Sequence, residues 1–500
     1  MEWLQQQACR QQARCFLSVI NTQENTSTDY SYEDWYRIVI ARAYELSQSL
    51  PKKINRIAMI GPSSGLFLVT LFALSALDKE VVLLNNRLTK EEQDKQCQLT
   101  KVDICLSDWL PDVHLEELLA EAKTWQAEAN NQSVSGMTAT GHSDSSLFDV
   151  KTRPAWIDWV TSLCWQHKEE AIFAIMNTSA TSGQMKSVPL RWGQIQAHVK
   201  ASAQVLGVEE EDNWLDVLPL FHVSGLSIVL RSLYNGTKVT LVTKYKAELV
   251  RNLLTSGIIS MVSLVPTLLG PMHLDKPYGL RVILLGGEYI PPALVDTCLQ
   301  HHLPVYKTYG MTETFAQSTT VNVLRHPDKK ESVGKPLPGV SIDIVNPDAN
   351  GIGLIYIQSP MLMSGYLGKE PLRGAFNTDD VGYMDADGYL YILNRRKDLI
   401  ISGGENIYPK EIEDIVYTLP KIEACALVAC PSHKWGQVPI LFYEGQAKAD
   451  RIQVKLKEQL AAYKQPKKII HLAHMPRNAS GKVLRKDLWE QAKNYADTID

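Results

Sequence analysis

The 500-residue sequence lacks any apolar run long enough to cross a membrane. Its longest uncharged apolar run, GLFLVTLFALSAL at residues 65–77, falls short of the roughly 20 residues that a transmembrane helix needs. We therefore expect a buried helix there. The N-terminal segment, MEWLQQQACRQQARCFL, lacks the apolar core of a signal peptide and has the pattern of an amphipathic helix. These absences predict a soluble, cytoplasmic protein.

The chain also lacks a strong excess of charge. Its 51 Lys and Arg nearly balance its 55 Asp and Glu, which gives a formal net charge of -4. So small a net charge offers no general attraction to nucleic acid or anionic lipid, so we expect neither as a partner. The eight cysteines are scattered, and we recognise no Cys-x-x-Cys motif or Cys/His ligand spacing among them. This predicts reduced thiols rather than disulfides or a structural zinc site.

Apolar residues, in contrast, make up 45% of the chain and recur as short β-rich runs separated by helical patterns. In chain order these runs are RIAMIG (56–61), AIFAIM (171–176), KVTLV (238–242), IISMVSLVP (258–266) and RVILLGG (281–287). The alternation predicts an α/β fold with mostly parallel sheets and flanking helices. Ligands of such folds bind at the carboxyl ends of the strands.

The length of the chain predicts more than one domain. Residues 127–146 are polar, small and aperiodic, so we interpret them as a surface connection within the first domain. After residue 394 a charged, Gly-containing segment leads into helical spacing of apolar residues over 412–419. We predict a large N-terminal domain over 1–394 and a small, mobile α+β C-terminal domain over 395–500.

One polar loop follows the predicted strand AIFAIM. Its sequence, NTSATSGQMKSVPL at residues 177–190, places hydroxyl and backbone N–H donors around one lysine, which suits a polyphosphate. The alternative is a flexible surface turn. Nothing in the chain reads GxxxxGK[ST], so this is not a Walker loop. The candidate phosphate ligands are Thr178, Ser179, Thr181, Ser182, Gly183 and Lys186.

Six further motifs follow in a recognisable order. They are PLFHVSG (219–225), LLGGEYIP (284–291), KTYGMTET (307–314), FNTDDVGY (376–383), NRRKDLIISGGENIYPKEIE (394–413) and PRNASGKVLRK (476–486). Their order and spacing resemble the acyl- and aryl-CoA ligases of the adenylate-forming superfamily. A narrower set resembles the o-succinylbenzoate CoA ligases of menaquinone biosynthesis: LLNNRLTKEE (83–92), PLFHVSGLSIVLRSL (219–233), SLVPTLL (263–269), SGGENIYPKEIE (402–413) and KWGQVP (434–439).

The resemblance implies a two-step ligase. The carboxylate of an acid attacks the α-phosphate of MgATP to form an acyl adenylate, and the thiol of coenzyme A then displaces AMP. The expected small-molecule partners are therefore o-succinylbenzoate, ATP and coenzyme A, with Mg²⁺ as cofactor, and a homo-oligomer stays open. Three alternatives remain: another acyl- or aryl-CoA ligase, a stand-alone adenylation domain that serves a carrier protein, and a binding protein that keeps the fold without turnover.

The resemblance also implies catalytic roles. Thr181 and Lys186 belong to the phosphate loop, in which Ala180 and Ser187 stand where the family has Gly. Lys482 corresponds to the lysine that bridges the substrate carboxylate and the phosphate. Glu313 corresponds to the carboxylate that helps hold Mg²⁺.

For the nucleoside, the resemblance implies that Tyr309 stacks on adenine and that Asp380 and Arg395 bind the ribose. Asp379 stands where Gly is usual, which leaves open which of the two aspartates binds the hydroxyls. A carboxylate suits a vicinal diol because it only accepts hydrogen bonds. The remaining expected ATP contacts are Gly286, Gly287 and Glu288, then Gly310, Met311 and Thr312.

The acyl pocket is expected around His222, with Ser224, Gly225 and Thr267 on its walls. Amino-acid-activating relatives carry an Asp at the position of His222, so an amino acid substrate is disfavoured. Arg231 is the nearest cation in the sequence for the second carboxylate of o-succinylbenzoate, although on a helix it can instead face a structural salt bridge.

The small domain is expected to work in two poses. The resemblance assigns the hinge to Lys397 and places Gly403 and Gly404 beside the path of coenzyme A.

Overall fold

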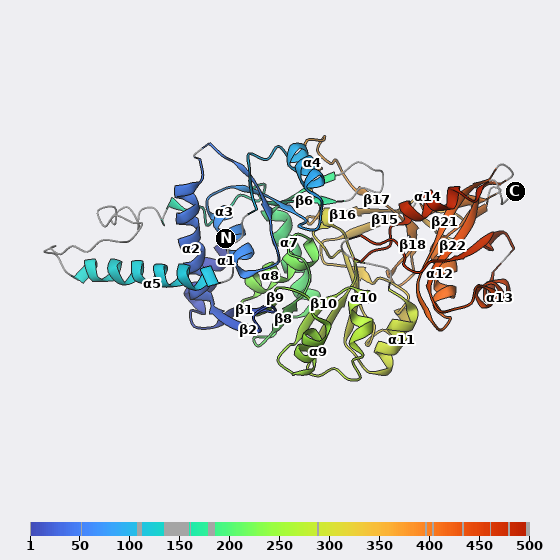
Figure 1. The fold of residues 1–500 in the computed structure, drawn as a ribbon, viewed down its shortest axis with the longest axis horizontal. Helices are drawn as coiled ribbons and strands as arrows, with labels where there is room; N and C mark the ends of the chain where they lie inside the picture. Colours follow the sequence, from blue (N-terminus) through green and yellow to red (C-terminus); the bar gives the residue numbers. More distant parts are fainter. Residues whose placement is uncertain are drawn as a thin grey trace.

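Parallel strand pairing organises the larger part of the molecule, which confirms the predicted fold class. A computed structural model shows three sheets before residue 396 and a fourth after it. In Figure 1 the C-terminal unit lies at one end of the molecule, and helix α5 projects from the other. The structure describes residues 2–51, 53–107, 113–134, 160, 162–178, 186–287, 290–395, 398–402, 405–432, 435–460, 462–478 and 481–496.

The largest sheet has nine strands in the order β14-β13-β12-β11-β10-β8-β9-β1-β2. Its strands are β1 (Cys15–Asn21), β2 (Thr26–Ser31), β8 (Asn213–Asp216), β9 (Lys238–Val242), β10 (Met261–Leu264), β11 (Val282–Leu285), β12 (Val305–Tyr309), β13 (Thr319–Asn322) and β14 (Lys335–Pro336). From β12 to β1 every neighbouring pair is parallel. Its helices are α7 (Trp192–Leu206), α8 (Val223–Asn235), α9 (Ala247–Thr255), α10 (Pro266–Leu269) and α11 (Pro292–Gln300).

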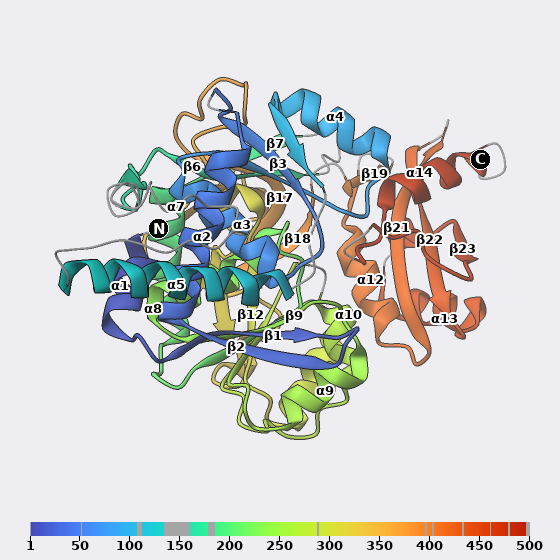
Figure 2. The same ribbon diagram turned by 60° about the vertical axis from the view of Figure 1, so that its left-hand side comes forward.

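A second sheet has five strands in the order β5-β3-β4-β6-β7. Its strands are β3 (Arg56–Ile60), β4 (Glu80–Leu84), β5 (Ile104–Leu106), β6 (Ile172–Thr178) and β7 (Lys186–Arg191). The helices that precede these strands or lie between them in the chain are α1 (Glu2–Arg10), α2 (Tyr32–Ser49), α3 (Gly65–Ala76), α4 (Lys90–Thr100) and α5 (Val113–Val134). Every residue of α3 is buried, as expected from its apolar sequence. One continuous core joins α2, α3, α7 and α8 with strands of both sheets (Figure 2).

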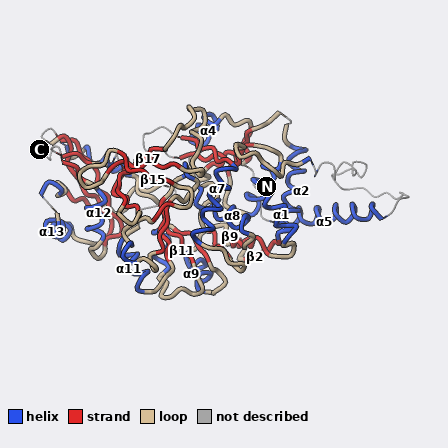
Figure 3. Tube along the Cα trace, turned by 180° about the vertical axis from the view of Figure 1, so that it is seen from behind, coloured by secondary structure: helices blue, strands red, loops and turns tan. Residues whose placement is uncertain are grey.

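The third sheet is antiparallel and has four strands, β15 (Ser341–Val345), β16 (Gly353–Gln358), β17 (Phe376–Met384) and β18 (Leu390–Arg395). The C-terminal sheet has five strands, and with its helices it confirms the predicted small α+β unit. It contains β19 (Ile400–Ser402), β20 (Glu405–Ile407), β21 (Ile422–Ser432), β22 (Gly436–Gly445) and β23 (Lys468–His471), with α12 (Pro409–Tyr417), α13 (Ala449–Gln459) and α14 (Arg485–Lys493). Figure 3 shows α12 and α13 beside the strands of this unit. The domain boundary at 394/395 stays a prediction.

Two local expectations are correct only in part. The N-terminal helix ends at Arg10, and residues from Cys15 form β1, because Leu17 pairs with Val239 of β9 and is fully buried. The expected connection over 127–146 begins inside α5, which runs to Val134. That helix packs along α2, so its buried first turns stabilise its continuation through polar residues. Residues 135–146 lie outside the described part of the chain.

Among the described residues, no helix combines the length and apolar character that crossing a bilayer requires. All eight cysteines are described, and each is a free thiol.

An ion pair between the buried Glu413 and the partly exposed Arg485 links three elements of the small domain. Arg485 donates from Nη2 to both carboxylate oxygens of Glu413, at 2.7 and 2.6 Å, and from Nη1 to the carbonyl of Leu427 at 2.7 Å. Glu413 also accepts from the backbone N–H of Leu427 at 2.6 Å. The pair therefore joins α12, β21 and the start of α14.

We predict that Glu413→Gln lowers the free energy of opening of this domain by about 1.5–3 kcal/mol, because the hydrogen bonds that the charged carboxylate accepts from Arg485 and from the Leu427 N–H are weakened. Hydrogen exchange of peptides from α12 and β21 measures this change. Glu490→Gln is the matched control, since its exposed pair with Lys493 is worth less than about 1 kcal/mol. Equal exchange in the two variants would contradict a stabilising role for the Glu413–Arg485 pair.

Candidate active site

Four parallel strands end at one edge of the nine-stranded sheet, and about half of the predicted site residues follow them. Leu264 of β10 pairs with Leu285 of β11, which pairs with Lys307 of β12. β8 lies beside β10 in the same direction. The segments that follow these strands contain His222, Thr267, Gly286, Gly287 and Tyr309–Thr312. The sheet therefore brings the predicted acyl and nucleotide segments to one edge, as expected for parallel α/β folds.

The predicted phosphate loop connects two paired strands. Thr178 of β6 pairs with Lys186 of β7, and Asn177 pairs with Ser187. Ser187 Oγ donates to Asn177 Oδ1 at 2.6 Å, and Asn177 Nδ2 donates to Gln96 of α4 at 2.8 Å. The serine that replaces a family glycine thus anchors the base of the loop. Ser179, Thr181, Ser182 and Gly183 lie outside the described residues.

Tyr366 joins the phosphate-loop lysine to the predicted metal ligand. Lys186 Nζ lies 4.8 Å from the centroid of the Tyr366 ring, and Tyr366 OH donates to Glu313 Oε1 at 2.9 Å. The backbone carbonyl of Glu313 also accepts from the N–H of Met363 at 2.8 Å. Glu313 is therefore held close to the lysine, so the two predicted catalytic residues share one neighbour.

Sequence reasoning did not select Tyr366. The available signal was an aromatic residue between two glycines in SGYLG at 364–368. Gly365 and Gly368 both have positive φ angles, of 131° and 71°. A loop built on such glycines can carry an aromatic side chain over a neighbouring element.

The structure separates the two candidate ribose aspartates. Asp380 is 3% exposed, and its Oδ2 accepts from Tyr309 OH at 2.6 Å. Asp379 is exposed and has φ of 59°, a left-handed conformation that Asp tolerates better than most residues. This conformation accounts for the glycine that the family usually has there. Asp380, which pairs with the backbone of Arg395, is the aspartate beside Tyr309.

Close backbone packing explains two of the predicted ATP-site glycines. A Cβ on Gly286 would lie 2.8 Å from the carbonyl oxygen of Thr308, and one on Gly310 would lie 1.5 Å from that of Ala316. Ala316 and Phe315 have positive φ angles of 81° and 51°, and their turn follows a 3-10 helix over Thr312–Thr314. Strained backbone of this kind is frequent in ligand-binding segments. Glu288 lies outside the described residues.

The predicted acyl pocket begins at the N-terminus of α8. His222 precedes the helix, and burial lowers its pKa to about 4, with the charge of Arg87 acting in the same direction. The imidazole is therefore neutral near pH 7. Gly225 packs against backbone, since a Cβ there would lie 2.6 Å from the carbonyl oxygen of Pro219. Ser224 lies in the first turn of α8, and Thr267 lies in α10.

Arg231 lies further along α8 and is 2% exposed. Its Nη2 donates to His198 Nε2 at 2.8 Å and to Gln317 Oε1 at 3.3 Å, and the guanidinium lies 5.2 Å from the Trp214 ring centroid. Burial lowers the pKa of Arg231 to about 9. Among the described residues, no carboxylate forms a salt bridge with it. Arg231 therefore lies in a buried environment of uncharged side chains. The alternative expectation, that Arg231 forms a structural salt bridge, is not met among the described residues.

Lys482 lies in the small domain, in a turn that its own backbone holds. Its N–H donates to Asn478 Oδ1 at 2.9 Å, and its carbonyl accepts from the Asn478 N–H at 2.8 Å. Lys397, Gly403 and Gly404 lie outside the described residues, as does the side chain of Arg395.

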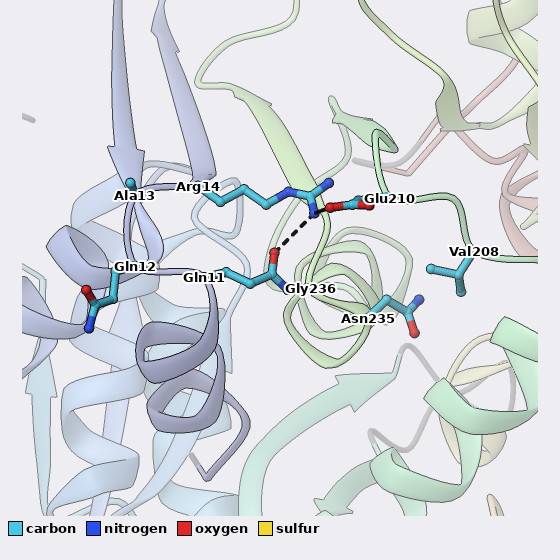
Figure 4. A pocket seen from close by; sticks show the side chains of 8 residues that line it. All are labelled: Gln11, Gln12, Ala13, Arg14, Val208, Glu210, Asn235 and Gly236. Carbon is cyan, nitrogen blue, oxygen red and sulfur yellow. Dashed lines mark hydrogen bonds and ion pairs between the residues drawn. The ribbon is translucent and has the colours of Figure 1, made fainter.

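A surface hollow of about 750 Å³ lies elsewhere, between the end of α1 and the end of α8 (Figure 4). Arg14 in its wall donates to Gln11 Oε1 at 3.1 Å and to Glu210 Oε1 at 3.2 Å. None of the predicted site residues lines it. The hollow is therefore separate from the predicted active site.

Comparison with known families identifies the fold and chemistry together. The model of the AMP-binding enzyme family matches residues 4–367, and that of the AMP-binding enzyme C-terminal domain matches residues 411–482. The chain belongs to the AMP-binding enzyme family. This membership confirms the predicted adenylate-forming resemblance and the enzyme class of AMP-forming acyl-CoA synthetases.

Two relatives within the AMP-binding family are both 2-succinylbenzoate–CoA ligases. The chain is 50% identical over 436 residues to the 2-succinylbenzoate–CoA ligase of Lactococcus lactis subsp. lactis (strain IL1403), covering 87% of this chain and 90% of that protein. It is 30% identical to the 2-succinylbenzoate–CoA ligase of Staphylococcus aureus (strain MSSA476), covering 97% and 99%.

Two solved structures of o-succinylbenzoate CoA synthetase from Bacillus subtilis resemble the whole chain. The complex with the acyl-adenylate intermediate OSB-AMP has a TM-score of 0.82 at 29% identity, covering 97% of both chains. The complex with ATP and magnesium ion has a TM-score of 0.80 at 28% identity, covering 97% of this chain and 99% of that one.

We predict that Asp380→Asn raises the KM for ATP by roughly tenfold or more, since hydrogen bonds to a charged group contribute about 1.5–3 kcal/mol. Asp379→Asn, at the exposed neighbour, should change it by less than about twofold. Steady-state kinetics with varied ATP measure both. A larger effect at Asp379 would reverse the assignment of the ribose aspartate.

Proposed function

We propose that the chain joins o-succinylbenzoate to coenzyme A at the expense of ATP, in menaquinone biosynthesis. The observation that carries this proposal is the 50% identity to the Lactococcus lactis ligase across 87% of the chain. The meeting of the predicted acyl and nucleotide segments at the carboxyl edge of the nine-stranded sheet supports it. The co-substrates are ATP and coenzyme A, with Mg²⁺ as cofactor.

In the first half-reaction the succinyl carboxylate of the substrate attacks the α-phosphate of ATP. The bond to pyrophosphate breaks and the acyl adenylate forms. Lys186, Thr178 and Thr181 would bind the phosphates, and Lys482 would bridge the attacking carboxylate and the α-phosphate. Such contacts offset charge on the transferring group and hold the reacting atoms in line.

Glu313 is the residue proposed to hold Mg²⁺. Its carboxylate is oriented by Tyr366 and lies near Lys186, and Mg²⁺ in nucleotide sites takes one or two carboxylates together with phosphate oxygens. The bound ion neutralises phosphate charge. Thr312, in the same short helix as Glu313, would contact the α-phosphate.

The nucleoside would lie beside the Tyr309–Asp380 pair. Asp380 would accept from the ribose hydroxyls, and Arg395 would assist there. The backbone of Gly286, Gly287 and Gly310 would line the adenine pocket, together with Met311 and Glu288.

The acid would lie along α8 and α10, with its second carboxylate left unreacted. His222 is neutral and offers an uncharged aromatic ring, while Ser224 and Thr267 offer hydroxyl groups. Gly225 would form part of the wall. A buried, unpaired carboxylate costs several kcal/mol, and Arg231 is a buried cation with neutral neighbours. We therefore propose that Arg231 helps to bind the aromatic carboxylate of the substrate, directly or through water.

In the second half-reaction the thiol of coenzyme A attacks the carbonyl carbon of the adenylate. The bond to AMP breaks, the thioester forms and the thiol loses its proton. The small domain would change pose about Lys397 between the two steps, placing Gly403 and Gly404 beside the entering coenzyme A. We further propose a cytoplasmic location, which the eight free thiols support.

We expect the purified protein to form a CoA thioester efficiently from o-succinylbenzoate and poorly from benzoate, 4-phenylbutyrate or decanoate. Measured kcat/KM values for the four acids test this. A preference of tenfold or more for a simple acid, about 1.4 kcal/mol in transition-state terms, would refute the substrate while leaving the ligase chemistry intact.

In the same assay, Arg231→Gln should raise the KM for o-succinylbenzoate more than the KM for ATP.

Lys482→Ala should abolish formation of the adenylate, measured by pyrophosphate release, because the bridging charge is lost. It should still convert supplied acyl adenylate and coenzyme A to thioester. Lys486→Ala, in the same domain, serves as the matched control and should retain both steps. Equal loss of both half-reactions in Lys482→Ala would reject the division of labour between the two poses.

A further inference from the structure

A thiol, an imidazole and a carboxylate converge away from the predicted active site. Cys164 Sγ lies 3.5 Å from His167 Nδ1, and His167 Nδ1 lies 3.9 Å from Asp78 Oδ1. The three atoms all lie within 4.8 Å of one another. Donors that share a tetrahedral zinc ion, with bonds of about 2.0–2.3 Å, lie roughly 3.3–3.6 Å apart. The Cys164–His167 separation matches the spacing that one such ion imposes, and the His167–Asp78 separation is slightly longer.

The surrounding structure holds the imidazole in place. The His167 side chain is 4% exposed, and its ring stacks on Trp192 with centroids 5.2 Å apart and an angle of 12° between the planes. Its Nε2 lies 3.4 Å from Ser75 Oγ. Metal-bound histidines usually engage their second ring nitrogen in this way, which sets the tautomer and aims the first nitrogen at the ion.

Backbone contacts bring the other two ligands to the same place. The N–H of Cys164 donates to the carbonyl of Ala76 at 2.9 Å, and the N–H of Asp78 donates to that of Ser75 at 3.0 Å. The cysteine segment is therefore tied to the end of α3, where Asp78 follows. The side chain of Asp78 is 76% exposed, so an ion can reach the cluster from solvent.

Cys164 and His167 have the Cys-x-x-His spacing in CWQH, so the prediction that the cysteines lack a Cys/His ligand spacing is wrong. The third donor is far away in the sequence, so no local motif includes it.

We propose that Asp78, Cys164 and His167 bind one divalent transition-metal ion of the zinc class, with water completing the coordination. Thiolate and imidazole donors favour zinc and cobalt over the magnesium and calcium that prefer oxygen ligands. On binding, the Cys164 thiol releases its proton to solvent and its sulfur bonds to the ion. The site ties the end of α3 to the segment that leads into β6, and is separate from Glu313.

The test uses the full-length, untagged protein after treatment with chelator. Titration with Co²⁺ should produce a sulfur-to-cobalt charge-transfer absorption that saturates at one equivalent. Cys164→Ser should abolish this absorption, whereas the matched variant Cys9→Ser, at an exposed cysteine, should keep it. Asp78→Asn should weaken Zn²⁺ binding at least tenfold in competition with a chromophoric chelator.

Thermal unfolding without nucleotide provides a second readout. Zn²⁺ should raise the Tm of the wild type and of Cys9→Ser, but not that of Cys164→Ser, because an ion that binds only the folded state stabilises it. An absorption that persists in Cys164→Ser, or the absence of stoichiometric Co²⁺ binding by the wild type, would overturn the proposal. Neither measurement depends on ligase activity.

Discussion

The shared direction of β8, β10, β11 and β12 is the constraint on which the predicted active site depends. Parallel neighbours end on the same side of a sheet, so segments distant in sequence emerge side by side. Substrate and nucleotide candidates become neighbours through this geometry, although no single segment contains them all. The helices that return the chain between these strands share one core with the second sheet, which holds the edge in position.

Two tyrosines connect this edge to other parts of the large domain. Tyr309 extends from the end of β12 to Asp380 of the antiparallel sheet. Tyr366 connects Glu313 to the strand that follows the phosphate loop. A phenol suits this task because its ring packs against neighbours while its hydroxyl donates to a carboxylate. The carboxylates assigned to ribose and metal are thereby oriented by residues outside their own motifs.

Departures from the family pattern have local physical explanations. Ser187 replaces a glycine and bonds to Asn177 at the base of the loop. Asp379 replaces a glycine and adopts the left-handed backbone that a glycine would adopt. The base of the phosphate loop and the hairpin that carries Asp380 are therefore both preserved. These substitutions favour retained nucleotide binding over a protein that keeps only the fold.

Much of the molecule follows from the sequence by itself. Strands such as Lys238–Val242 and the buried helix over Gly65–Ala76 follow from local hydrophobic patterns, because those patterns match the period of the element. Motif order also identified the family, since catalysis constrains residue types at set points along the chain. Local patterns could not locate Tyr366, choose between Asp379 and Asp380, or join Asp78 to Cys164 and His167. Only tertiary structure placed Tyr366 beside Glu313, Asp380 rather than Asp379 beside Tyr309, and the three candidate metal ligands together. Each of these placements depends on side chains from distant segments meeting in space, and sequence periodicity carries no information about such distances.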